Sequence, residues 1–207
     1  MLNDGIALMT YDLIAAAVLA VWIYLIAARG GFWLASVRDD VRPLLQMPWP
    51  EVIAVVPARD EADCVAESIG SLLDQHYPGI FSVILVDDQC IDETAAFASH
   101  AAEARGASGR LTIISGKPPP AGWMGKTWAQ QQGIDVAQRH SPRPTYLLLT
   151  DADIVHAPDT LAWLVAKAQS TGSVLTSLMA KLNCESFAEQ ALIPAFIYFF
   201  QMLYPFR

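Results

Sequence analysis

Acidic side chains recur in this sequence directly after short runs of apolar, strand-forming residues. Asp87 and Asp88 follow one such run, and Asp151 and Asp153 follow another at a spacing of two residues. Two carboxylates at that spacing on an extended chain point to the same side and can share a divalent cation. Mg²⁺ takes oxygen ligands and commonly bridges one or two carboxylates to substrate phosphates, and Mn²⁺ suits the same oxygen donors. The pattern favours a metal-assisted site for a phosphorylated ligand.

Other polar residues follow further apolar runs. Pro57, Arg59 and Glu61 lie just after the first run, and Lys126 falls at the start of a predicted helix. Free N–H groups and a cation at a helix N-terminus both favour phosphate binding. Asp87 and Asp88 can accept hydrogen bonds from a ribose or a base, because ionised carboxylates are acceptors only. The alternatives are helix capping for these acids and for Asp92, and a solvated side chain for Lys126.

Strands and helices are predicted to alternate from residue 51 onward. Apolar, β-branched runs predict five strands, and helical spacing of apolar residues predicts four helices between and after them. This alternation predicts an α/β domain with a mostly parallel sheet flanked by helices, whose ligands bind beyond the carboxyl ends of the strands. Pro57 is expected to end the first strand. The predicted strands are 52–56, 81–86, 111–114, 146–149 and 173–178, and the predicted helices are 63–75, 91–104, 126–139 and 158–169.

Several classes of protein are disfavoured by what the sequence contains. A net charge of −8 argues against nucleic acid as a partner. No glycine-rich dinucleotide fingerprint, P-loop or serine nucleophile elbow is present. The cysteines, Cys64, Cys90 and Cys184, lack metal-ligand spacing, and we expect them to be reduced thiols.

Taken together, these motifs resemble glycosyltransferase family 2, which has the GT-A fold. The resemblance rests on the order of 57–61 (PARDE), 86–88 (VDD), 92–94 (DET), 125–133 (GKTWAQQQG) and 151–153 (DAD). It covers about residues 51–207. Segments 118–133 and 191–206 resemble more narrowly the hopene-associated glycosyltransferases of bacteria.

The resemblance implies a role for each matching residue. It implies displacement at the anomeric carbon with inversion, a Mg²⁺ or Mn²⁺ cofactor, a UDP-linked sugar donor and a lipid acceptor of hopanoid type. Asp88 is implied to hold the nucleoside, with Asp87 supporting Asp88, and Lys126 is implied to approach the diphosphate. Asp151 and Asp153 are the implied metal ligands. The full set of implied nucleotide-sugar-binding residues is Pro57, Arg59, Glu61, Asp87, Asp88, Lys126 and Asp151.

No catalytic base is assigned by the sequence. Glu185 and Glu189 are the only acids after Asp159, and neither lies in a base-like motif. We therefore expect the chain to be truncated, with the base beyond Arg207. Two alternatives remain open: a catalytically incomplete nucleotide-sugar-binding membrane protein and a nucleotidyltransferase.

An apolar segment near the N-terminus, about residues 5–28, approaches the ~20 residues that a spanning helix needs. The positive residues Arg29, Arg38 and Arg42 follow it, which predicts a cytoplasmic domain on a bacterial inner membrane. The alternatives are a signal peptide, disfavoured by the lack of a positive start, and a buried helix. The predicted organisation is an anchor at 1–42, a linker at 43–50, a GT-A domain at 51–185 and an apolar segment at 186–207, which is interfacial, a second membrane hairpin or a core helix.

Overall fold

The computed structural model describes residues 2–34, 48–140 and 142–205. The chain forms two compact units, one of Pro43–Leu178 and the other of Met1–Arg42 together with Met179–Arg207. The predicted linker at 43–50 falls largely outside the described residues. The larger unit carries the sheet and is described first.

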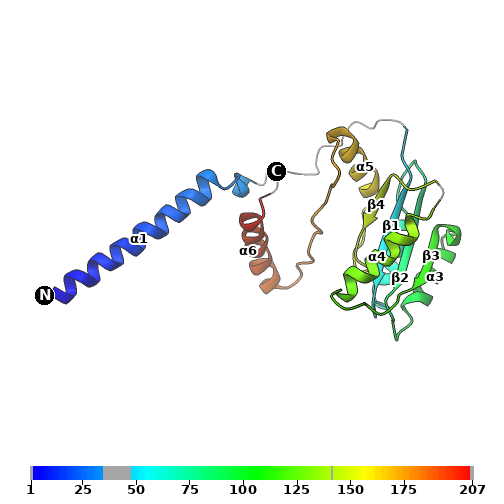
Figure 1. The fold of residues 1–207 in the computed structure, drawn as a ribbon, viewed down its shortest axis with the longest axis horizontal. Helices are drawn as coiled ribbons and strands as arrows, with labels where there is room; N and C mark the ends of the chain where they lie inside the picture. The colour runs from blue at the N-terminus through cyan, green and yellow to red at the C-terminus, as the bar shows by residue number, and fades with distance from the viewer. Residues whose placement is uncertain (1, 35–47, 141, 206–207) are drawn as a thin grey trace. The chain divides into compact units, whose positions relative to one another are not determined.

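Four parallel strands form one sheet in the order β3-β2-β1-β4 (Figure 1). All seven residues of β1 are buried, as expected for a central parallel strand covered on both faces. The predicted α/β architecture with a parallel sheet is confirmed. The strands are β1 (Val52–Ala58), β2 (Phe81–Asp87), β3 (Leu111–Ser115) and β4 (Tyr146–Leu149).

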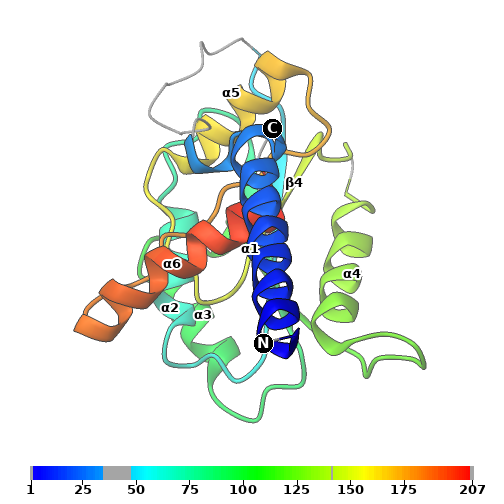
Figure 2. The ribbon, with the colours of Figure 1, turned by 90° about the vertical axis from the view of Figure 1, so that its left-hand side faces the viewer.

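Helices cover both faces of this sheet, and Figure 2 shows α4 on one side with α2 and α3 on the other. Alternate residues of β1 divide between the two cores: Ile53 and Val55 pack with α4, whereas Val52, Ala54 and Val56 pack with the other helices. The helices begin and end within three residues of their predicted bounds. They are α2 (Val65–Leu73), α3 (Thr94–Glu103), α4 (Gly125–Ala137) and α5 (Thr160–Thr171), with a short 3-10 helix at Ser108–Arg110.

The first strand runs two residues further than predicted. Pro57 was expected to end it, but β1 continues through Pro57 to Ala58 in register with Val86 and Asp87 of β2. The pairing of β1 with β4 stops at Val55. Proline is tolerated where a strand has a neighbour on one side only, because its missing N–H then removes no ladder hydrogen bond.

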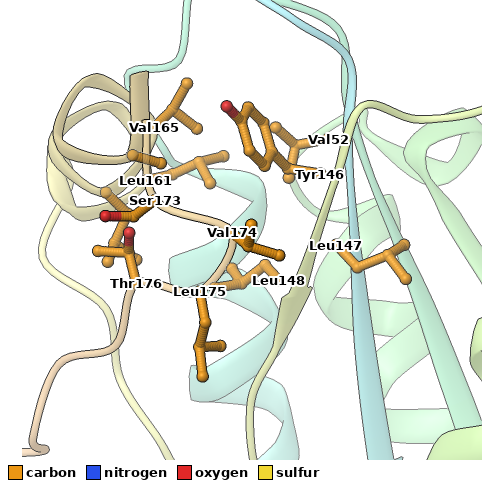
Figure 3. Close-up of a pocket in the computed structure, with 12 residues that line it drawn as sticks. Val52, Tyr146, Leu147, Leu148, Leu161, Val165, Ser173, Val174, Leu175 and Thr176 are labelled. Carbon is orange, nitrogen blue, oxygen red and sulfur yellow. The ribbon is translucent and has the colours of Figure 1, made fainter. Parts of the chain in front are cut away.

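The fifth predicted strand, at 173–178, is wrong. The chain leaves α5 through Gly172 in the left-handed conformation and then runs beside β4 without strand pairing. Val174 and Leu175 lie largely exposed along an apolar groove that Tyr146 and Leu148 also line (Figure 3). Apolar, β-branched composition indicates strand propensity, but a strand also needs a partner ladder, and this segment has none among the described residues.

The smaller unit contains two apolar helices, α1 (Leu2–Ala28) and α6 (Phe187–Leu203), and a 3-10 helix at Phe32–Leu34. Residues Met9–Ala28 of α1 are long and apolar enough to cross a membrane, by length and composition. The described side chains of this stretch are almost all exposed. The single apolar spanning candidate predicted near the N-terminus is therefore present as one continuous helix.

Candidate functional site

A pocket opens at the carboxyl ends of β1, β2 and β4, where the alternating topology predicts ligand binding. It has a volume of about 180 Å³. Seven of the residues singled out from the sequence line it, although they come from four separate segments of the chain. The lining residues are Pro57, Ala58, Arg59, Glu61, Asp88, Lys126, Asp151, Ala152 and Asp153.

Asp88 is the most buried charged residue of the pocket, with only 3% of its surface exposed. Its Oδ2 lies 3.8 Å from Nη1 of Arg59, whose own side chain is mostly exposed. Its Oδ1 is buried and accepts no hydrogen bond from any residue that the structure describes. A buried acceptor without a donor costs free energy, so Asp88 is prepared to accept a hydrogen bond from a ligand N–H or O–H.

The N-terminus of α4 reaches the same pocket. The N–H groups of Gly125, Lys126 and Thr127 precede the first intrahelical bond, which Trp128 donates to Met124, and no side chain caps this end. A Cβ atom on Gly125 would lie 3.6 Å from Oδ2 of Asp88, so the helix end and the buried carboxylate are neighbours. Unpaired N–H groups at a helix N-terminus form an anion site.

Lys126 pairs with Asp151 across the pocket, with 2.8 Å between Nζ and Oδ2. Both side chains are about half exposed or more, so solvent screens the pair and it adds little to stability. The pair can open at low cost, which leaves both groups available to a ligand.

Asp87 does not line the pocket. Its Oδ1 accepts a hydrogen bond from the backbone N–H of Cys90 at 2.9 Å, and its own carbonyl accepts one from Gly116 at 2.7 Å. Asp87 therefore holds the two loops that follow β2 and β3.

The loop after β1 is held by Asp92 and Thr94, which belong to one of the motifs of the family resemblance and of which Asp92 was also a candidate helix cap. The N–H of Glu61 donates to Oγ1 of the buried Thr94 at 2.9 Å, and the N–H of Ala62 donates to Oδ2 of Asp92 at 3.1 Å. Asp92 accepts from Thr94 as well, which lowers the pKa of its carboxyl group. Segment 92–94 therefore fixes the loop that carries Arg59, a role that local sequence spacing does not reveal.

The pocket is acidic, because four carboxylates line it against two cationic groups. A diphosphate would be repelled by this excess unless a cation accompanied it. Asp151 and Asp153 flank the buried Ala152 and line the same cavity, so their oxygen donors suit Mg²⁺ or Mn²⁺. The residues present thus fit a divalent cation.

A second group of possible ligands lies outside the pocket lining, at Asp60, Cys90 and Asp92. Its oxygen atoms already serve the loops: Oδ1 of Asp60 accepts from the N–H of Ile91, and Asp92 accepts from two backbone N–H groups. Burial raises the pKa of the Cys90 thiol, which keeps it protonated and a poor ligand. This cluster is explained by loop structure and is not assigned a metal.

A basic side chain, a helix N-terminus and paired carboxylates at the carboxyl edge of a parallel sheet are typical of proteins that bind a phosphorylated ligand with a metal. The family model described as glycosyl transferase family 2 matches residues 53–206. The chain belongs to that family, which confirms the resemblance to glycosyltransferase family 2. No curated protein sequence matches it.

Solved structures of glycosyltransferases are also similar. A mannosyltransferase from Pyrobaculum calidifontis in complex with GDP-Man and Mn²⁺ is 28% identical, with a TM-score of 0.49, over 72% of this chain and 43% of that one. S. aureus TarS is 18% identical, with a TM-score of 0.48, over 66% of this chain and 24% of that one. This chain thus spans less than half the length of these structures.

Proposed function

We propose that this chain binds a nucleotide-linked sugar with a divalent cation and takes part in transfer of that sugar with inversion at the anomeric carbon. The observation that carries the proposal is Asp88, a buried carboxylate with an unused oxygen at the centre of the pocket. Membership of glycosyl transferase family 2 supports the reaction class and argues against a nucleotidyltransferase.

We propose that the nucleoside binds against Asp88. Oδ1 of Asp88 has no hydrogen-bond donor among the described residues. The hydroxyl groups of ribose and the N–H groups of uracil or guanine would supply one. Pro57, Arg59 and Glu61 form the adjoining wall, and the guanidinium of Arg59 is exposed enough to move onto a base or a phosphate. We propose a UDP-linked donor from the family resemblance, with GDP-linked donors as the competing case.

We propose that the diphosphate binds between Lys126 and the N-terminus of α4. Nζ of Lys126 would leave Asp151 and donate to a phosphate oxygen, and the N–H groups at the start of α4 would donate to another. Asp151 and Asp153 would then hold the Mg²⁺ or Mn²⁺ ion. When bound, such an ion neutralises the charge that develops on the departing nucleoside diphosphate.

In the transfer step, an acceptor hydroxyl attacks the anomeric carbon and gives its proton to a general base. The bond from that carbon to the diphosphate oxygen breaks, and the nucleoside diphosphate leaves with the electron pair. The pocket acids Glu61, Asp88, Asp151 and Asp153 are all used for binding or metal in this assignment. Glu189 accepts a hydrogen bond from the N–H of Ser186 in the capping box of α6, so its carboxylate has a structural role. The base is therefore unassigned, which keeps donor binding without turnover as the second candidate function.

The membrane setting is also part of the proposal. The apolar stretch Met9–Ala28, followed by Arg29, supports a bilayer anchor with the pocket unit on the cytoplasmic side of a bacterial inner membrane. A membrane-held enzyme of this class suits a lipid acceptor, and the narrower resemblance points to a hopanoid-related one.

The test is thermal stabilisation of the full chain by UDP, GDP and their sugars, each with Mn²⁺ and with EDTA. At least one nucleotide should raise the melting temperature of the wild-type chain with Mn²⁺, and Asp88→Asn should lose most of that shift. Glu103→Gln, an exposed acid on α3, is the matched control and should keep it. An unchanged shift in Asp88→Asn would contradict the assignment.

A further inference from the structure

The residues that follow α1 form a corner that receives the C-terminal end of α6. Nη2 of Arg29 donates to the carbonyl oxygen of Leu203 at 2.7 Å, and Nε donates to that of Met202 at 3.2 Å. The last carbonyl groups of a helix lack intrahelical partners and carry partial negative charge, so a guanidinium there satisfies both needs. Arg29 thus joins the end of α1 to the end of α6, 173 residues later in the sequence.

The corner is also shaped by packing. Gly30 and Gly31 have φ values of 65° and 62°, which turn the chain directly after α1. Phe32 is then only 5% exposed, and its ring meets that of Tyr198 edge to face with centroids 5.2 Å apart. A Cβ atom on Gly30 would lie 3.3 Å from Cβ of Pro205, a tight fit. The contact between the end of α1 and the end of α6 therefore combines hydrogen bonds, an aromatic ring contact and a close approach of the Gly30 backbone to Pro205.

Beyond this corner, α6 presents an apolar surface with no buried residue among those described. Residues 191–205 contain no charged side chain, whereas the first turn is polar and closed by a capping box between Ser186 and Glu189. Its 17 residues span about 25 Å, less than the ~30 Å of a bilayer core. The large side chains that α6 exposes are Phe187, Leu192, Phe196, Tyr198, Phe199 and Leu203.

We propose that α6 lies in the surface of the bilayer at the point where α1 leaves it, and that Arg29 and Phe32 hold it there. The inference rests on the proposed membrane anchorage of α1. If Met9–Ala28 spans, Arg29 sits at the boundary with water, and the end of α6 that it caps sits at the same level. The occupant of the apolar surface of α6 is then lipid acyl chain.

The polar residues before α6 argue for a helix in the plane of the membrane. Lys181, Asn183 and Glu185 precede Ser186 and would have to cross the bilayer if α6 spanned it. Pro194 inside α6 also interrupts the hydrogen bonding that a lipid-facing spanning helix needs. Both ends of α6 therefore stay on one side.

This arrangement has a consequence for the pocket unit. The unit of Pro43–Leu178 is joined to the smaller unit at both of its ends. With α1 and α6 both at the membrane, the pocket unit is tethered twice to one leaflet.

The experiment measures the depth of spin labels in the full chain, reconstituted in vesicles of phosphatidylcholine and phosphatidylglycerol. Labels are placed one at a time on Leu192→Cys, Phe196→Cys and Val18→Cys, in a background with Cys64, Cys90 and Cys184 changed to serine. Collision rates with oxygen and with a water-soluble nickel chelate give the depth of each label. We expect the two α6 labels about 5–10 Å below the headgroups and the Val18 label near the bilayer centre.

Arg29→Ala should then shift the α6 labels toward water, with the Val18 label and nucleotide binding unchanged, and Arg29→Lys should restore part of the depth. A deep Val18 label with water-accessible α6 labels would overturn the inference but leave the anchor. Labels on α6 shielded from both reagents would also overturn it, since they would indicate a protein partner or a second copy. A water-accessible Val18 label would overturn the inference and the membrane part of the proposed function.

Discussion

Removing Lys126 should weaken binding of a diphosphate while leaving binding of the metal alone intact or slightly tighter. Without ligand, Nζ of Lys126 lies 2.8 Å from Oδ2 of Asp151 and competes with a cation for that carboxylate. With ligand, the same ammonium would donate to phosphate. A hydrogen bond to a charged group contributes about 1.5–3 kcal/mol, which corresponds to about 10- to 150-fold in Kd.

Loss of the ion pair between Lys126 and Asp151 should have the opposite effect on the affinity for the metal alone. An exposed pair contributes about 0–1 kcal/mol, so Mn²⁺ alone should bind Lys126→Ala at most about fivefold more tightly than wild type. The free energy of unfolding should change by no more than about 1 kcal/mol. Thus one substitution should move the two affinities in different directions.

Isothermal titration calorimetry can separate these effects with three titrants: Mn²⁺ alone, a nucleoside, and the matching nucleoside diphosphate with Mn²⁺. Lys117→Ala is the matched control, because this exposed lysine precedes α4 and does not line the pocket. A Lys126→Ala variant that binds the nucleoside as much more weakly as the diphosphate, or that binds the diphosphate as wild type does, would refute this role of Lys126.

Three further outcomes are expected. Asp153→Ala should abolish the Mn²⁺ dependence of diphosphate binding together with most of the affinity, and calorimetry with and without EDTA checks this. Gly133→Ala should lower the free energy of unfolding by about 1–3 kcal/mol, because its Cβ would overlap a methyl group of Val55. Gly109→Ala is the control, since its Cβ would meet nothing within 4 Å, and thermal melts compare the two variants. Burial lowers the pKa of His156, so the unfolded state binds more protons than the folded state near pH 6, and the free energy of unfolding should fall as the pH drops from 7 to 5. Urea unfolding of His156→Gln should show a weaker fall. An equal fall would contradict the role of His156 in this pH dependence.

The sheet was predictable because its strands are buried on both faces and therefore appear as continuous apolar runs. The errors arose where pairing partners decide the structure. Pro57 stays in β1 because the pairing of β1 with β4 has already stopped at Val55. Residues 173–178 stay outside the sheet because they pair with no strand among the described residues. Neither fact is contained in local composition.

The candidate site was predictable to the extent that it follows strand ends. Parallel strands bring their carboxyl ends to one edge, so residues after β1, β2 and β4 had to converge. Three features depend on side-chain geometry between distant segments, which spacing alone does not fix: the pairing of Lys126 with Asp151, the unused oxygen of Asp88 and the support from Thr94.

The central claim is that the nucleotide binds in the pocket around Asp88, and photoaffinity labelling tests it most directly. The full chain would be irradiated with azido-uridine and azido-guanosine diphosphates in Mn²⁺, and the labelled peptides mapped by mass spectrometry. We expect labels within residues 57–61 or 87–90, and we expect EDTA and unlabelled nucleotide to suppress them. Labels confined to the apolar groove beside β4, or labels that unlabelled nucleotide does not displace, would contradict it.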